Sequence, residues 1–228
     1  MEGEKNEMSF LGHLEELRWH LVRSAAAIFI IGILLFVFQK EVFNHFLLAH
    51  RKSDFITYQI FCDFFNLFGM DSTFCNVAFT DNLISLKPTQ QLMTAIWSSL
   101  ILGIILAFPY LLWELWRFIS PGLTKKEVKS SRGFMFIASF LFFCGIAFSF
   151  YVIAPISIHF LYNYKISDVI QNNFTLESHI GLVTNMLLGV SVLFELPVLV
   201  YFLTKIGLVT PEFLKTYRKH ALVLVLIL

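Results

Sequence analysis

Residues 133–164 contain no Asp, Glu, Lys or Arg, and this uncharged stretch limits the folds open to the chain more than any other feature. A helix crosses the hydrocarbon core of a bilayer, about 30 Å thick, with about 20 mostly apolar residues. Charged residues make up 14% of the chain and apolar residues 57%. Because soluble domains carry about 25% charged residues, the composition argues against a soluble enzyme and excludes disorder. It predicts an all-α integral membrane protein.

Further apolar windows predict a polytopic helical bundle with four full spans and the start of a fifth. We expect the spans at about residues 21–39, 89–115, 133–155 and 178–204, with a fifth apolar run at 219–228. The fifth run is too short to cross a bilayer, so either it ends within the membrane or the sequence is part of a longer protein. The whole chain, 1–228, is expected to be one membrane domain, which also contains an amphipathic helix at 1–20 and loops at 40–88 and 156–177.

Lys and Arg are distributed unevenly between alternate loops. Twelve of them lie in the N-terminal region, between the second and third spans, and before the fifth run, whereas five lie in the other two loops. Basic residues accumulate on the cytoplasmic side of membrane proteins. The pattern therefore predicts a cytoplasmic N-terminus, with loops 40–88 and 156–177 outside. The net charge of +1 gives no general attraction for nucleic acid.

The two outer loops contain features with two interpretations each. Cys62 and Cys75 both fall in loop 40–88, where an oxidising compartment permits a disulfide, and the alternative is two free thiols. Asn173 to Thr175 matches a glycosylation sequon, but we interpret Thr175 as the N-cap of the following helix.

The cytoplasmic segments carry charged residues at helical spacing. Residues 9–23 are typical of an amphipathic helix, for which the simplest interpretation is an interfacial helix with a solvated charged face. Thr124 and Glu127 match a capping box, in which Thr124 is the N-cap and Glu127 the third helical residue. That structural role must be weighed against any binding role for Glu127.

Three stretches occur in order along the chain: SFLGHLEELR at 9–18, FPYLLWELWRFISPGLTKKE at 108–127, and LFELPV at 193–198. Together they resemble the TatC family, the multi-span core of the twin-arginine protein translocase. Members of that family have six spans and both termini in the cytoplasm. The resemblance covers nearly the whole chain, and it ends within the fifth span.

The resemblance implies a receptor for export signals that carry two adjacent arginines. Such a translocase moves folded proteins across the bacterial inner membrane using the proton motive force. Its implied partners are signal peptides, single-span TatA- or TatB-type subunits, further copies in a receptor complex, and membrane lipid. By motif, Glu16 and Glu127 would contact the arginine pair, and Arg18, Pro109 and Phe118 would border that site. With this resemblance, we favour binding over a purely structural role for both glutamates.

Glu195 is a charged residue inside the fourth expected span, two residues before Pro197. Such residues usually face protein or a water-filled cavity. We interpret Glu195 as an intramembrane polar site that docks a partner or admits water, and the alternative is a protonated side chain bonded to a neighbouring helix. Glu114 and Arg117, three residues apart in a helix, are expected to form a local ion pair.

Several motifs of enzymes are missing from the sequence. There is no phosphate-binding GxxxxGK[ST] loop, no nucleophile motif, and no metal-ligand spacing among the seven histidines. We therefore expect no enzyme activity, no cofactor and no metal. The main alternative function is a proton-coupled small-solute secondary transporter with Glu195 as its proton site, and a more distant one is an interaction scaffold.

Overall fold

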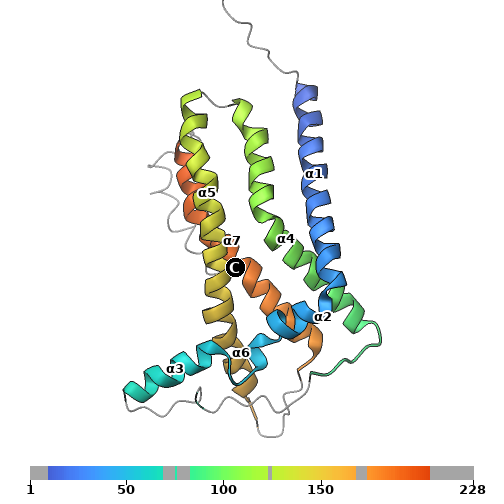
Figure 1. Cartoon of the computed structure of the whole chain (residues 1–228), viewed down its shortest axis with the longest axis vertical. Coiled ribbons are helices and arrows are strands. Elements are labelled where there is room, and N and C mark those ends of the chain that lie inside the picture. The colour runs from blue at the N-terminus through green and yellow to red at the C-terminus, as the bar shows by residue number, and fades with distance from the viewer. Residues whose placement is uncertain (1–9, 69–74, 76–82, 123–124, 168–173, 206–228) are drawn as a thin grey trace, which may run out of the picture.

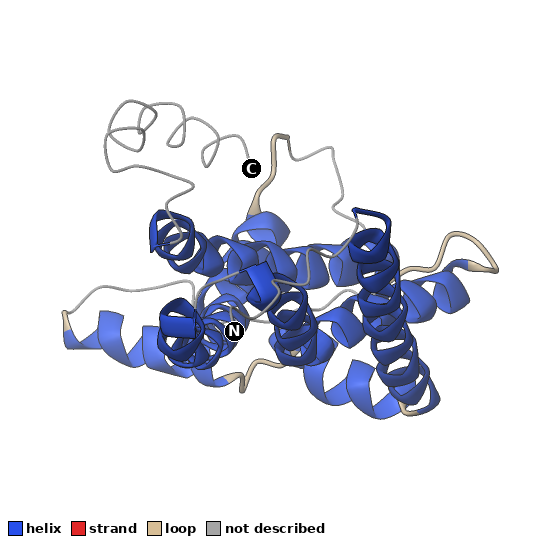
Figure 2. Ribbon diagram, turned by 90° about the horizontal axis from the view of Figure 1, so that it is seen from above, coloured by secondary structure: helices blue, strands red, loops and turns tan. Residues whose placement is uncertain are grey.

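The computed structural model describes residues 10–68, 75, 83–122, 125–167 and 174–205. The regular elements in these ranges are helical (Figure 2), apart from an isolated bridge between Ile84 and Thr175. Four helical segments are long and apolar enough to cross a membrane: Leu14–Val37, Gln90–Ile119, Gly133–Asn163 and Leu176–Thr204. The all-α class and the four full spans are thereby confirmed, and the fifth run lies outside the described residues.

The described elements follow one another as short and long helices. They are α1 (Phe10–Val37), α2 (Gln39–Val42), η1 (Phe43–Leu47), η2 (Ala49–Arg51), α3 (Ile56–Leu67), α4 (Gln90–Ile119), η4 (Ser120–Gly122), α5 (Lys125–Phe148), η5 (Ser149–Ile153), α6 (Ala154–Asn163) and α7 (Leu176–Lys205). The expected amphipathic segment is continuous with the first span, because α1 contains no proline and runs unbroken through both.

The long helices pack as two linked pairs. α1 lies against α4, α5 lies against α7, and α4 also contacts α7 (Figure 1). At Gly103, an added Cβ would lie 3.0 Å from the carbonyl oxygen of Ile28 and 3.2 Å from Cα of Gly32. The two glycines therefore allow the backbones of α1 and α4 to approach closely, as small residues commonly do between membrane helices. In the core, the rings of Phe108 and Phe142 stack with their centroids 3.6 Å apart.

Residues 39–67 form a cap segment at one end of the bundle, where it contacts a break in the third long helix. Pro155 has no N–H, and a proline ring clashes with the carbonyl four residues earlier, here that of Tyr151. The helix widens into a π turn at η5 just before this proline. The hydroxyl of Thr57 donates to the Tyr151 carbonyl at 2.5 Å, and Nε2 of His50 donates to the Phe150 carbonyl at 2.8 Å. The cap segment thus satisfies carbonyls at the break.

Two local features at the cap end had alternative interpretations in the sequence. The structure joins Cys62 in α3 to Cys75 by a disulfide, and α3 lies across the direction of the long helices (Figure 1). The backbone N–H of Ser178 donates to the hydroxyl oxygen of Thr175 at 3.2 Å. This is the N-cap bond expected at the start of α7, so the prediction for Thr175 is confirmed.

Candidate functional site

Three of the expected site residues lie near the end of the bundle opposite to the cap segment, and a fourth, Pro109, lies further into the bundle on α4. Figure 1 shows the start of α1, the end of α4 and the start of α5 at this end, which we call the site end. Glu16 and Arg18 lie near the start of α1, and Pro109 and Phe118 lie in the second half of α4. The fold therefore brings to one end of the molecule two motifs that are far apart in the sequence.

Glu16 presents a carboxylate oxygen without a partner. Its side chain is half-buried, and its Oε2 is buried with no hydrogen-bond partner among the described residues. Leaving a buried carboxylate oxygen without a donor costs free energy, which a donor supplied by a ligand would recover. The neighbouring Glu15 and Arg18 are exposed, and the Arg18 guanidinium lies 5.6 Å from the centre of the Trp19 ring. Burial distinguishes Glu16 from the carboxylate next to it.

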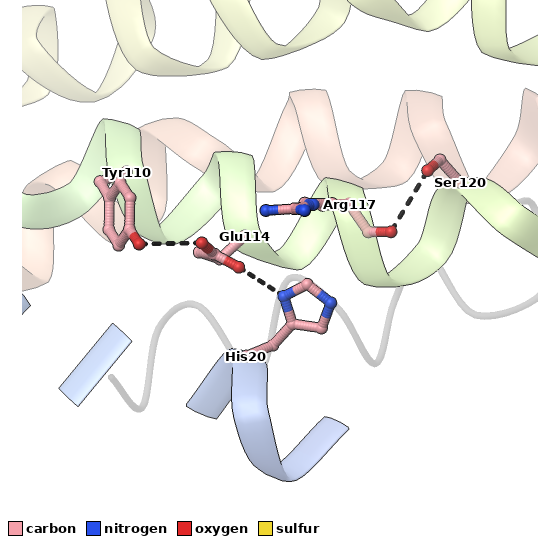
Figure 3. Close-up of polar contacts among 5 residues, drawn as sticks. All are labelled: His20, Tyr110, Glu114, Arg117 and Ser120. Atoms are coloured by element: carbon pink, nitrogen blue, oxygen red, sulfur yellow. Dashed lines mark hydrogen bonds and ion pairs between the residues drawn. The ribbon is translucent and has the colours of Figure 1, made fainter. Parts of the chain in front are cut away.

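A buried polar cluster joins α1 to α4 one helical turn after Glu16 on α1. Glu114 on α4 is 1% exposed, and it accepts a hydrogen bond from the Tyr110 hydroxyl at 2.8 Å. Its other carboxylate oxygen accepts from Nδ1 of His20, a buried residue on α1 (Figure 3). The His20 ring also meets the Phe118 ring edge to face, with centroids 6.0 Å apart. We call His20, Tyr110 and Glu114 the α1–α4 cluster.

The ion pair that we expected between Glu114 and Arg117 is not formed between these two described residues. Glu114 faces α1 and is buried, whereas Arg117 and Trp113 are exposed. The Arg117 guanidinium lies 5.7 Å from the centre of the Trp113 ring, a position typical of a cation–π contact. Residues three apart lie about 60° apart around a helix, so one can face a neighbouring helix while the other lies at the edge of that face, and the partner of Glu114 comes from α1.

The α1–α4 cluster was missed by the sequence analysis because its central contact joins residues that are 94 positions apart. Part of its signal was present in the sequence. Tyr110 and Glu114 are spaced four apart on one helix, as are Glu16 and His20 on another, so each pair shares a helix face. A carboxylate in an apolar span also demands a partner, and this argument applied to Glu114 as well as to Glu195.

The last expected site residue, Glu127, falls in the first turn of α5, at the site end (Figure 1). Its side chain and its expected N-cap, Thr124, lie outside the described residues. Both the capping role and the binding role of Glu127 therefore stay predictions. The position of α5 in the chain brings its backbone close to the end of α4.

Glu195 lines a cavity between α4, α5 and α7. The cavity has a volume of about 240 Å³ and is otherwise apolar where it is lined by Phe108, Trp116, Ala138 and Phe202. The Oε1 atom of Glu195 is buried and has no hydrogen-bond partner among the described residues. Both interpretations of Glu195, an intramembrane polar site that docks a partner or admits water and a protonated side chain bonded to a neighbouring helix, stay predictions.

Metal coordination has no candidate in the part of the chain that the structure describes. Within these ranges, no three His, Cys, Asp or Glu side chains gather as a group that could hold a metal ion. The expectations that the protein needs no metal and no cofactor stay predictions.

Comparisons with known proteins agree on one family. The model of the family described as Sec-independent protein translocase protein (TatC) matches residues 12–228. The chain is 38% identical to the Sec-independent protein translocase protein TatC of Blattabacterium sp. subsp. Periplaneta americana, over 100% of this chain and 86% of that protein. It is 35% identical to the protein of the same name from Helicobacter pylori strain J99, over 94% of this chain and 74% of the relative.

The fold agrees with the same relatives. A crystal structure described as the twin-arginine translocase receptor TatC in DDM superposes with a TM-score of 0.71 and 28% sequence identity. The superposition covers 93% of this chain and 84% of the other. Sequence and fold therefore point to one group of proteins over nearly the whole chain.

Proposed function

The chain belongs to the TatC family, and from this premise we propose that it forms the signal-recognition core of a twin-arginine translocase. In this role it binds signal peptides that carry two adjacent arginines, and it exports folded proteins across the bacterial inner membrane using the proton motive force. The observation that carries the proposal is the half-buried Glu16, whose Oε2 has no hydrogen-bond partner among the described residues, at the end of the bundle where the family motifs meet.

The chemistry of recognition follows from the shape of the guanidinium group. A guanidinium presents a planar fork of donors that a carboxylate can meet with two parallel bonds, and an ammonium has no such fork. Glu16 supplies one carboxylate and Glu127 the second, so each arginine of the pair meets one glutamate. An exposed ion pair contributes only about 0–1 kcal/mol, so partial burial of Glu16 is what makes the contact useful.

The remaining motif residues shape the surroundings of this carboxylate pair. Phe118 and Pro109 add apolar surface on α4, against which the apolar stretch of a signal peptide packs. Arg18 is exposed on α1, about 200° around the helix from Glu16, so it borders the site from the other side of that helix.

The orientation proposed for the chain puts the site end in the cytoplasm and the cap segment on the outer side. The basic residues near both ends of α1, α4 and α5 support this assignment, since more of them lie at the site end. An outer cap segment also accounts for the Cys62–Cys75 disulfide, because oxidising compartments maintain disulfides. The chain itself catalyses no reaction in this scheme.

The cavity at Glu195 is the proposed docking site for a polar group of a single-span TatA- or TatB-type partner. Its unpartnered Oε1 supplies the acceptor, and its apolar lining suits a helix that lies within the membrane. Glu195→Ala is then expected to weaken crosslinking to the partner, whereas Leu199→Ala, which alters only the apolar lining, retains the acceptor. Normal partner crosslinking and normal transport by Glu195→Ala would remove this assignment.

Site-specific crosslinking to a twin-arginine signal peptide tests the receptor function. Membrane vesicles that contain the chain and its partners are irradiated with a peptide that carries a photoreactive group beside the arginine pair. Glu16→Gln and Glu127→Gln are expected to lower the crosslinked fraction by roughly tenfold, because a hydrogen bond to a charged group contributes about 1.5–3 kcal/mol.

Glu15→Gln is the matched control, since Glu15 is an exposed carboxylate in the same turn as Glu16. It should crosslink as the unaltered chain does. If Glu16→Gln and Glu127→Gln both crosslink at the unaltered level, the two glutamates do not contact the arginine pair.

A further inference from the structure

The α1–α4 cluster is a fully bonded buried polar group among the described residues of the site end, and the receptor function leaves it without a role. Glu114 is 1% exposed, and its two carboxylate oxygens accept from two different elements. Tyr110 donates from one turn earlier on α4, at 2.8 Å, and His20 donates from α1. The bond from Tyr110 orients the Glu114 carboxylate from within α4, and the bond from His20 joins α4 to α1.

This arrangement fixes the rotation of α1 about its axis. The His20 ring contacts the Glu114 carboxylate (Figure 3) and also the Phe118 ring, and both of these belong to α4. Successive residues of a helix are about 100° apart around its axis, so a small rotation of α1 would remove the His20 ring from both contacts.

Glu16 lies four residues before His20 and therefore on the same face of α1, one turn closer to the site end. Whatever sets the rotation of α1 at His20 also sets the direction in which the Glu16 side chain leaves the helix. Among the described residues, the buried Oε2 atom of Glu16 has no hydrogen-bond partner, so within this part of the chain its position depends on the helix that carries it.

We propose that His20, Tyr110 and Glu114 are positioning residues, which hold the Glu16 carboxylate in the orientation needed for two-bond recognition of a signal-peptide guanidinium. The proposal rests on the receptor function and extends it from binding to specificity. A pair of parallel bonds requires the two groups to be held within about 0.5 Å and 10–20° of the productive geometry. A lysine ammonium behaves more nearly as a point charge and tolerates a rotated carboxylate.

The test compares two peptides that differ only in the pair, Arg-Arg or Lys-Lys. Their dissociation constants are measured by titration of the purified full chain in detergent, for the unaltered chain and for each variant. His20→Ala is expected to weaken binding of the Arg-Arg peptide by roughly tenfold and that of the Lys-Lys peptide by less than about threefold, so the preference falls.

Conservative variants separate positioning from simple loss of structure. His20→Asn retains a donor close to the place of Nδ1 and is expected to recover most of the preference. Tyr110→Phe removes a single hydroxyl and is expected to lower the preference partially, and it serves if His20→Ala fails to fold. Ser98→Ala is the matched control, because the Ser98 hydroxyl is buried in α4 but bonds only to carbonyls of its own helix.

The possible outcomes distinguish the receptor function, the positioning role and a purely structural role of the cluster. If the unaltered chain binds both peptides equally, the receptor function itself fails. If the unaltered chain prefers Arg-Arg and His20→Ala and Tyr110→Phe keep that preference, the positioning role is wrong. If a variant weakens binding of the Arg-Arg and Lys-Lys peptides equally, the cluster contributes to stability alone, and the proposal is also overturned. A loss of preference in His20→Ala with recovery in His20→Asn supports it.

Discussion

Replacing Gly145 with alanine tests whether α5 and α7 pack as closely as the structure places them. An added Cβ at this buried position would lie 2.8 Å from Cα of Ser191 and 3.1 Å from Cβ of Phe194. Carbon atoms in ordinary contact are about 3.5–4.0 Å apart, so the two helix backbones would have to separate by roughly 1 Å. Overpacking of this kind costs about 1–3 kcal/mol in the free energy of unfolding.

Gly189→Ala is the matched control for this change. Gly189 lies on α7, and an added Cβ there would meet no atom within 4 Å. Both substitutions gain the same helix propensity, about 1 kcal/mol, because alanine loses less backbone entropy than glycine in a helix. The difference between the two variants therefore isolates the cost of the clash at Gly145.

Thermal unfolding of the detergent-solubilised chain measures that difference. For a chain of 150–250 residues, 1 kcal/mol shifts the unfolding midpoint by about 2–4 °C. Gly145→Ala is therefore expected to unfold roughly 2–12 °C below Gly189→Ala. Equal midpoints for the two variants would refute the close packing of α5 on α7.

Three further predictions concern the cap end. Burial lowers the pKa of His50 below its usual 6.5, so protonation favours the unfolded chain. The stability provided by neutral His50 is full above pH 6.5 and is lost progressively as the pH falls from 6.5 towards the lowered pKa of the folded chain, so thermal unfolding from pH 8 to pH 5 should show a shallower decline for His50→Gln. Cys62→Ser with Cys75→Ser opens a loop of sequence separation 13, which should cost up to about 3 kcal/mol and speed proteolysis in that loop. Thr175→Ala removes the N-cap bond of α7 and should lower the unfolding free energy by about 1 kcal/mol, measured by denaturant titration.

The parts of the fold that follow from hydropathy and local spacing could be predicted from the sequence. The uncharged windows are long enough to cross a bilayer whatever their neighbours, so four spans were expected and are present. The N-cap at Thr175 is a contact between residues three apart, and contacts of that range are encoded in local sequence. The third span continues to Asn163, past the expected end at 155, because the chain passes Pro155 through a π turn without leaving the helix.

The contacts that position the site could not be predicted in the same way. Glu114 had a plausible partner three residues away, but its donor is His20, on a helix that the chain reaches only through tertiary packing. The lack of a hydrogen-bond partner for Glu16 Oε2 among the described residues likewise depends on burial, which results from tertiary packing. Motif resemblance singled out Glu16, and its binding role stays a prediction, whereas the resemblance carries no information about how either carboxylate oxygen is buried.

The measurement that tests the central claim most directly is the affinity of the unaltered chain for signal peptides that differ only in their paired basic residues. Titration of the purified chain should show that an Arg-Arg peptide binds roughly tenfold more tightly than its Lys-Lys counterpart, because only the guanidinium can form two parallel bonds to each glutamate. Equal dissociation constants for the two peptides would contradict the assignment of this chain as a twin-arginine signal receptor.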